Sequence, residues 1–249
     1  YVVSYNTVEN SVNWLTYSDS GNHILSNVEL DLENNSAYLG LVNTETFQVS
    51  KSFIIKIDLS SGGITGKSDL TSYGYENYVH DLCLANDTLY ALSRVNNSRE
   101  MGSNRVMVSK FTSSLQYIGS HIILADSANT LDKLNTGTIL NRNNSLYVWN
   151  GFFGDFARLD YNMNHQWTKN YYRNLSGLDG SDGYHLYENK QGFIVVSGYY
   201  PSVTQLDHNG NHIWSRFIEG LILKNGYCNV ISNANAHYVI ATRVKSTIP

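Results

Sequence analysis

The sequence of 249 residues has few of the residues and segments that mark other protein classes. It has only 2 prolines, and no proline-, glycine- or serine-rich linker interrupts it, so we expect one domain rather than two. No apolar segment approaches the roughly 20 residues that a membrane-spanning helix needs. The first residues also lack the charged and apolar regions of a signal peptide. Because the chain begins at Tyr1, we expect either a processed mature form or a piece of a longer protein.

Cysteine is equally scarce. Cys83 and Cys228 are the only 2 cysteines, which excludes a disulfide framework and a cysteine-rich metal cluster. Both fall in strands that are expected, from the repeat described below, to be the innermost strands of separate sheets. A disulfide requires Cα atoms within about 7 Å of one another. We therefore expect two buried thiols, and we expect no metal site.

Charge is low as well. Charged residues make up 15% of the chain, and the net charge is −4. Their signs are mixed along the sequence, without the basic stripe that nucleic acids or anionic membranes attract. We expect no nucleic-acid partner and no membrane span.

Most of the chain is filled by a recurring unit of short strands. The unit is clearest at Phe193 to Ser197, Val203 to Leu206 and Ile213 to Phe217. The first of these segments is a continuous apolar run, as in a strand that is covered on both faces. Asp207 to Asn211 contains residues that tolerate left-handed backbone, so it closes a tight hairpin. The unit is an antiparallel meander.

A tight polar turn before a tyrosine-containing strand marks the repeat. The clear copies begin at Asn34, Asn86 and Asn143. Their spacing of about 40 to 50 residues is that of four-stranded propeller blades. An innermost strand precedes each marker, and a hairpin of third and outer strands follows it. The sequence thus predicts an all-β, five-bladed β-propeller of four-stranded antiparallel blades, a single domain over residues 1–249 whose blades start near residues 27, 79, 135, 182 and 226.

The two ends of the chain are predicted to build the closing blade together, with residues 1–26 completing the last blade. Val12 to Tyr17 and His23 to Asn27 would be its third and outer strands, and the C-terminal strands would lie inside them. Such closure removes an open sheet edge. One strand is then surplus, because Tyr1 to Ser4 and His237 to Arg243 both fit the second position. Three explanations stay open: a five-stranded blade, a chain cut from a larger propeller, or a strand that pairs with a neighbouring molecule.

The hairpins carry a family resemblance. Thr204 to Trp214 resembles the blade repeat of quinoprotein-like (PQQ-type) propellers, which reads roughly Leu-Asp-x-x-x-Gly-x-x-x-Trp. Ala157 to Trp167 is a second copy, and Ile57 to Gly63 contains a third. The resemblance implies the fold. The residues with which that family binds its quinone cannot be located here, so we expect no cofactor.

Two features invite a chemical interpretation. Asp160 to Asn164 and Asp207 to Asn211 look like the start of a calcium loop, but the later Gly and Glu of such loops are missing, and we interpret both as hairpin turns.

Carboxylates on the predicted innermost strands are the second feature. Asp81 with His80, or Glu29 with Asp31, could in principle form a glycosidase pair. Polar residues in this position more often line a channel and bind water, so we expect no catalytic residue.

Ligand binding is predicted on the face that carries the long connections between second and third strands and between blades. Loops on a rigid scaffold are where binding residues gather. These loops are rich in tyrosine, which offers a large contact area and a polar tip to sugars or proteins. The candidate residues are Tyr73, Tyr75, Arg99, Phe153, Tyr172, Arg173, Tyr199 and Tyr200.

Three of the five Asn-x-Ser/Thr sequons, at Asn34, Asn86 and Asn143, lie in the exposed turns between first and second strands. If the source is a eukaryotic secreted protein, we expect N-glycosylation at these three residues.

These observations favour a secreted, extracellular and non-catalytic propeller that serves as a structural or recognition module and binds protein or glycan through its long-loop face. Two alternatives are a small glycoside-active enzyme at the channel mouth and a subunit of an extracellular filament or surface array, which would self-associate through the surplus strand.

Overall fold

The structure, a computed structural model, describes residues 2–6, 8–9, 11–16, 23–43, 51–70, 76–96, 104–123, 137–150, 155–171, 185–197, 202–217, 228–232 and 238–242. These residues form 20 strands and the tight turns between them. Within these ranges, no helix long and apolar enough to cross a membrane is found. The chain divides into two compact units, residues 1–124 and 125–249.

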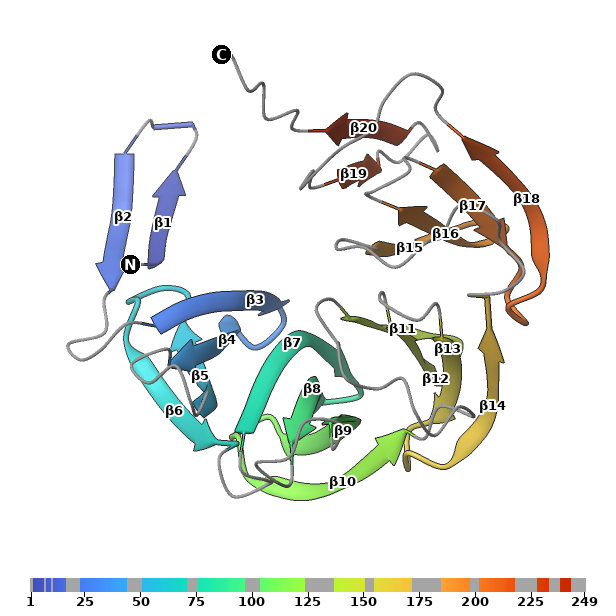
Figure 1. The fold of residues 1–249 in the computed structure, drawn as a ribbon. Helices are drawn as coiled ribbons and strands as arrows, with labels where there is room; N and C mark the ends of the chain where they lie inside the picture. The colour runs from blue at the N-terminus through green and yellow to red at the C-terminus, as the bar shows by residue number, and fades with distance from the viewer. Residues whose placement is uncertain are drawn as a thin grey trace, which may run out of the picture. The chain divides into compact units, whose positions relative to one another are not determined.

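The first unit contains one two-stranded and two four-stranded antiparallel sheets. The small sheet pairs β1 (Val2–Asn6) with β2 (Ser11–Thr16). The first large sheet is the meander β3 (His23–Asp31), β4 (Ser36–Asn43), β5 (Lys51–Asp58) and β6 (Ile64–Asp69). The second is the meander β7 (Glu76–Ala85), β8 (Thr88–Asn96), β9 (Asn104–Thr112) and β10 (Tyr117–Ile123). β3 and β7 are neighbours, so the two large sheets lie side by side (Figure 1).

The second unit repeats this arrangement. Its first sheet is β11 (Gly137–Arg142), β12 (Ser145–Asn150), β13 (Asp155–Asp160) and β14 (His165–Asn170). Its second is β15 (His185–Asn189), β16 (Gly192–Ser197), β17 (Ser202–Leu206) and β18 (His212–Phe217). A two-stranded sheet of β19 (Cys228–Ser232) and β20 (Tyr238–Thr242) follows. β15 contacts both β11 and β19, so the first strands of the three sheets are neighbours.

The burial pattern explains why the second strand of each sheet is the most apolar. All six residues of β12 are buried, and so are the first seven of β4. The outer strands β6 and β10 instead alternate between exposed and partly buried residues. A strand inside a stack of sheets is covered on both faces, whereas an outer strand has one face in water.

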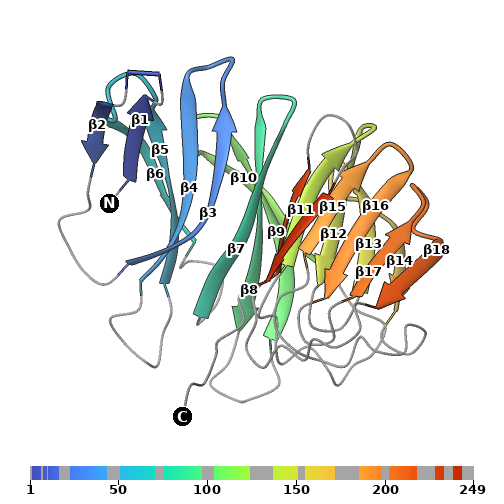
Figure 2. The ribbon, with the colours of Figure 1, turned by 90° about the horizontal axis from the view of Figure 1, so that it is seen from above.

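The predicted tight polar turns between first and second strands have left-handed backbone. Asn86 and Asp87 have φ angles of 50° and 56°, and Asn143 and Asn144 have 48° and 57°. Positive φ at both central residues makes a two-residue turn whose twist matches that of the flanking strands. In Figure 2, the β3–β4 and β7–β8 turns lie at the same end of their two sheets.

Asp160 and Asp207 close the hairpins between third and outer strands. The Asp160 carboxylate accepts the backbone N–H groups of Asn162 and Asn164, each at 2.8 Å. Asp207 accepts those of Asn209 and Asn211 at 2.8 and 2.7 Å. This is the hydrogen bonding of an Asp-stabilised turn, as interpreted from the sequence.

A tryptophan on an outer strand packs against the hairpin turn of the next sheet in both units. Trp14 on β2 covers Gly62 in the β5–β6 turn, and its Nε1–H donates to the Leu59 carbonyl at 2.6 Å. Trp167 on β14 covers Gly210 in the β17–β18 turn. Gly62 and Gly210 have φ angles of 72° and 70°. β2 therefore occupies the place of an outer strand, and β1 that of a third strand.

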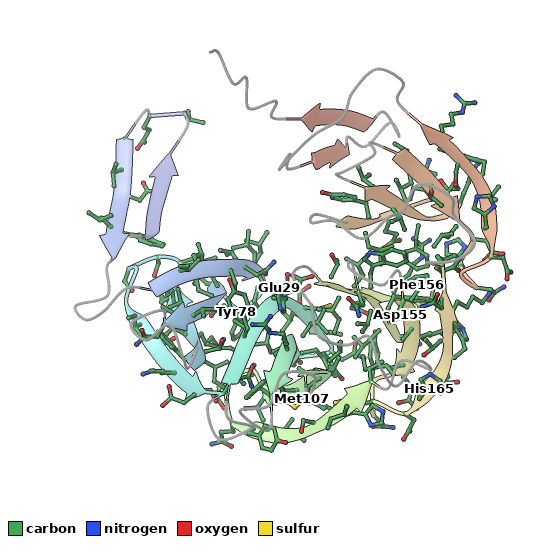
Figure 3. All side chains as sticks on the ribbon, in the orientation of Figure 1. Glu29, Tyr78, Met107, Asp155, Phe156 and His165 are labelled. Atoms are coloured by element: carbon green, nitrogen blue, oxygen red, sulfur yellow. The ribbon has the colours of Figure 1, made fainter. Side chains whose placement is uncertain are left out.

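Buried aromatic residues complete the contact between neighbouring sheets. The Tyr38 hydroxyl donates to the Ser113 carbonyl of the next sheet at 2.9 Å, and the Tyr147 hydroxyl donates to the His208 carbonyl at 3.3 Å. In the second unit, Phe156 lies in the centre of an aromatic cluster (Figure 3). These contacts stack each sheet on the next.

One part of the predicted strand assignment is wrong. His23 to Asn27 is not an outer strand paired with Val12 to Tyr17, because the whole of His23–Asp31 is one strand that pairs with β4. A bulge at Ser26 interrupts its register, and the polar residues there suggested a strand end. Ser11–Thr16 pairs instead with Val2–Asn6. With this correction, the described strands leave no surplus strand in the second position.

Candidate functional site

The eight loop residues predicted to bind a ligand lie outside the described residues. They are Tyr73, Tyr75, Arg99, Phe153, Tyr172, Arg173, Tyr199 and Tyr200. The structure therefore describes the predicted binding face only where strands end at it. In the first unit these ends include the start of β7 and the end of β8.

A buried hydrogen-bond network fixes the start of β7. Ser52 on β5 donates its hydroxyl proton to the Asn77 carbonyl at 2.7 Å and accepts the Val79 N–H at 3.0 Å. Asn77 donates from Nδ2 to the Leu70 carbonyl at 3.0 Å, and the Leu70 N–H donates to the Ser52 carbonyl at 2.9 Å. Because the network joins two sheets and both ends of the 71–75 connection, it holds this edge rigidly.

Next to this network, a β-bulge redirects His80. Val79 pairs with Ser93 and Asp81 with Leu92, so His80 is the extra residue on β7. Tyr78 stands opposite Arg94. The His80 and Tyr78 ring centroids are 4.8 Å apart, and the Arg94 guanidinium carbon lies 5.8 Å from the centroid of the Tyr78 ring. Bulges commonly turn a side chain toward a functional site. We call Tyr78, His80 and Arg94 the β7 cluster; Tyr78 is labelled in Figure 3.

His80 is uncharged at neutral pH. Burial, and then the nearby positive charge of Arg94, lower the pKa of His80 to about 3. Its Nε2 atom is buried and has no hydrogen-bond partner among the described residues. The single charge of the β7 cluster is therefore the guanidinium of Arg94.

Two further buried polar atoms at this strand end have no partner within the described ranges. They are Oδ1 of Asn77 and Oγ of Ser93. Ser93 is paired with Val79, and Asn77 is the neighbour of Val79 on the same face of β7. A buried polar group usually has a partner, so such a group needs an explanation. Because side chains alternate along a strand, these two atoms lie on the face of the blade opposite to that of Tyr78 and Arg94.

In the first large sheet, the side chain at the equivalent bulge already has a hydrogen-bond partner. There Ser26 is the extra residue on β3, and its hydroxyl donates to the Gly40 carbonyl at 2.9 Å. The two bulges occupy the same place in the repeat, but only the β7 bulge carries a ring that stacks on another aromatic side chain. The same β-bulge therefore presents different side-chain chemistry in the two sheets.

The carboxylates considered for catalysis have structural partners. Glu29 accepts the Leu84 N–H of β7 at 2.8 Å, and burial raises the pKa of Glu29. Asp31 accepts the Asn34 N–H at 3.1 Å, and Asp81 accepts the Leu82 N–H at 3.0 Å. Glu29 and Asp31 therefore join neighbouring sheets and close a turn, respectively.

No group of three or more His, Cys, Asp or Glu side chains suited to a metal occurs in the part of the chain that the structure describes. Cys83 is buried in β7, and the side chain of Cys228 lies outside the described part. The state of this second thiol stays a prediction.

The three sequons differ in their surroundings. Asn86 and Asn143 are exposed residues of left-handed turns. Asn34 is also exposed, but its Nδ2 donates to both carboxylate oxygens of Asp31, at 3.1 and 3.0 Å. A glycan on Asn34 would replace one donor of that pair, whereas Asn86 and Asn143 need no such change. Glycosylation at all three stays a prediction.

Sequence reasoning missed the β7 cluster as a unit. It considered His80 only as a neighbour of Asp81, and it did not consider Arg94. The position of Arg94 follows from the pairing of β8 with β7 across the bulge, and a bulge has no reliable signal in a single sequence. The sequence gives one hint of the cluster. Polar and apolar residues alternate poorly along this strand, around the run Tyr78-Val79-His80-Asp81.

Comparisons with known proteins place the fold. No family model matches the chain, and no curated protein matches it. Among solved structures, a protein of unknown function from Bacteroides caccae is 11% identical, with a TM-score of 0.52; the match covers 87% of this chain and 76% of that one. Quinohemoprotein alcohol dehydrogenase from Comamonas testosteroni is 12% identical, with a TM-score of 0.53, and the match covers 86% and 39% of the two chains. A neuraminidase-like protein from A/bat/Guatemala/164/2009 is 10% identical, with a TM-score of 0.51, over 81% and 61%.

The fold is a β-propeller. The resemblance of the repeat to quinoprotein-type blades is confirmed at the level of the repeat. The predicted fold class is confirmed too: the described strands form four four-stranded antiparallel sheets, and these sheets are blades. At such low identities the likeness concerns the fold alone. The chain spans only 39% of the Comamonas protein and 61% of the neuraminidase-like one.

Proposed function

We propose that this β-propeller is a non-catalytic recognition module that binds a glycan or protein through the blade edge where β7 begins and β8 ends. The observation that supports the proposal most is the β7 cluster. In this cluster an aromatic ring, a neutral imidazole and a guanidinium lie together on two paired strands. The hydrogen-bond network beside it joins two blades. Side chains on strands are held more precisely than those on loops, which lowers the entropic cost of binding.

The carboxylates of the innermost strands support the non-catalytic part of the proposal. Glu29 and Asp31 hold backbone and amide donors of their own chain, whereas a glycosidase needs two carboxyl groups directed at the substrate. We also propose an extracellular location, for which the exposed sequons at Asn86 and Asn143 give support. Mass spectrometry of the native protein tests this location through the attached sugars.

The binding proposal is tested by screening the purified full chain on glycan and peptide arrays and by repeating each positive result with Tyr78→Ala. We expect Tyr78→Ala to weaken binding at least tenfold, because Arg94 and His80 lose the ring on which both rest. Tyr117→Ala is the matched control, since Tyr117 lies on the outer strand β10 and is 40% exposed.

Equal binding by the Tyr78→Ala and Tyr117→Ala proteins would contradict the proposed site. Turnover of a glycoside that Glu29→Gln abolishes would instead establish the glycosidase alternative.

A further inference from the structure

The cation of the β7 cluster has no anionic partner among the residues that the structure describes. Among the described residues, Arg94 forms no salt bridge and no hydrogen bond from its guanidinium, although it is partly buried and lies over Tyr78. The Tyr78 ring holds the guanidinium in place, but a cation over a ring still has N–H groups that need acceptors.

Other partly buried cations that lie over aromatic rings in this protein do have acceptors. Lys56 lies over Tyr38 and donates to the Ser113 carbonyl at 3.0 Å. Arg158 lies over Tyr147 and donates from Nε to the Ser145 hydroxyl at 3.0 Å. These side chains have a structural role that Arg94 lacks in the described part of the chain.

The surroundings of Arg94 select the type of anion. The adjacent His80 is neutral, so the cluster offers one positive charge. One guanidinium matches one planar carboxylate, to which it can donate two parallel hydrogen bonds. The Nε2 atom of the adjacent His80, which is buried and has no hydrogen-bond partner among the described residues, suits a ligand with a hydroxyl group, because a hydroxyl can both donate and accept.

We infer that the ligand of this module is an acidic saccharide, whose carboxylate pairs with Arg94 while a sugar hydroxyl group forms a hydrogen bond with Nε2 of His80. This inference rests on the proposed function. Tyr78 acts as a positioning residue that fixes Arg94 and His80.

The test compares one saccharide with and without its charge. Trigalacturonate and its trimethyl ester have the same sugar rings, and isothermal titration calorimetry measures the affinity of the full chain for each. We expect the acid to bind at least tenfold more tightly than the ester, and we expect added salt to reduce this difference. Arg94→Gln should remove the difference by lowering the affinity for the acid to that for the ester.

Lys110→Gln is the matched control variant. Lys110 belongs to the same blade, and its Nζ lies 5.7 Å from the centre of the Tyr90 ring, so this change also removes a stacked cation but should preserve the preference for the acid. If Arg94→Gln does not fold, Arg94→Lys keeps the charge, and a reduced preference for the acid still supports bidentate pairing.

The failures of the two proposals can be told apart. If array ligands bind through Tyr78 while trigalacturonate binds no better than its ester, the recognition module stands and the acidic saccharide is wrong. If an acidic peptide such as hexaglutamate binds through Arg94 and trigalacturonate does not, the inference is also overturned, in favour of a protein partner. If no ligand depends on Tyr78 or Arg94, both proposals fail.

Discussion

Glu29 shows how one buried carboxylate makes stability depend on pH. Burial raises its pKa above 4.5, against the opposing effect of the Leu84 N–H. A raised pKa means that the folded chain binds the proton more tightly than the unfolded chain. The contribution of Glu29 to stability is therefore greatest below about pH 4.5 and falls as the pH rises through the folded-state pKa.

We predict that Glu29→Gln stabilises the protein at pH 7 and changes little at pH 4. The amide keeps an oxygen that can accept the Leu84 N–H but carries no charge to bury. Each unit by which the pKa is raised corresponds to about 1.4 kcal/mol at most, and the partial exposure of Glu29 reduces this amount. Thermal melting at both pH values measures the effect, and a lower Tm of the variant at pH 7 would show that the carboxylate is favourably solvated.

At the same scale, the sequence predicted the conformation of a residue better when neighbours in the sequence determine it than when a distant strand does. The tight turns at Asn86 and Asn143 were predicted from turn residues within a short stretch, and both asparagines have positive φ. The β7 cluster depends on the pairing of Arg94 with Tyr78 and on a bulge at His80, which are properties of strand register and not of composition.

The contact between neighbouring blades is made by an element that recurs: an outer-strand tryptophan on a left-handed glycine. A Cβ atom added to Gly210 would lie 2.9 Å from Cη2 of Trp167 and 3.1 Å from Cδ1 of Phe156, at a φ of 70°. Both the backbone and the packing therefore require glycine at this turn.

We predict that Gly210→Ala destabilises the protein by about 1 to 3 kcal/mol, as overpacking of a well-filled core does. Urea unfolding followed by tryptophan fluorescence measures the loss. Gly66→Ala is the control, since a Cβ there would meet its nearest atoms at an ordinary 3.6 Å without positive φ. If Gly210→Ala loses no more stability than Gly66→Ala, the prediction is wrong, and the turn and Trp167 adapt to the added methyl group.

Strands of the blades were predicted well where the hydrophobic pattern and the turn residues indicate the same strand ends. The strands β16, β17 and β18 match the three segments expected from the clearest copy of the repeat closely. The prediction was wrong where a bulge mimics a strand end, as at Ser26 in β3. A bulge shifts the alternation of side chains by one residue, so a single long strand reads as two short ones.

For the whole molecule, that one error produced the apparent surplus strand. Counting His23–Asp31 once gives β1 and β2 the places of third and outer strands, and β19 and β20 the places of first and second strands. The number of blades was predictable from the spacing of the repeats, whereas the role of each terminal strand required the contact of Trp14 with Gly62.

Two exposed apolar surfaces are consistent with a closing blade made from both ends. Leu25, Val28 and Leu30 on β3 are 45%, 43% and 55% exposed, although β3 is the first strand of a blade. Trp214 is paired on β18 with Gln205 as Trp167 is paired with Arg158, yet it is 37% exposed. In a closed propeller, first and second strands would cover the former surface, and a hairpin turn would cover the latter.

We predict that β1 pairs with the edge of β20 that faces away from β19 and has no partner among the described strands, so that residues 1–26 complete the last blade. Because paired N–H groups exchange slowly, the amides of β20 should be protected in the full chain and should exchange at least tenfold faster after deletion of residues 1–16. Hydrogen exchange read by mass spectrometry measures this, with β12, the fully buried second strand of another blade, as the internal control. If β20 exchanges equally in both chains while β12 stays protected, the ends do not share a blade, and the exposed surfaces of β3 and β18 are then available to a second molecule.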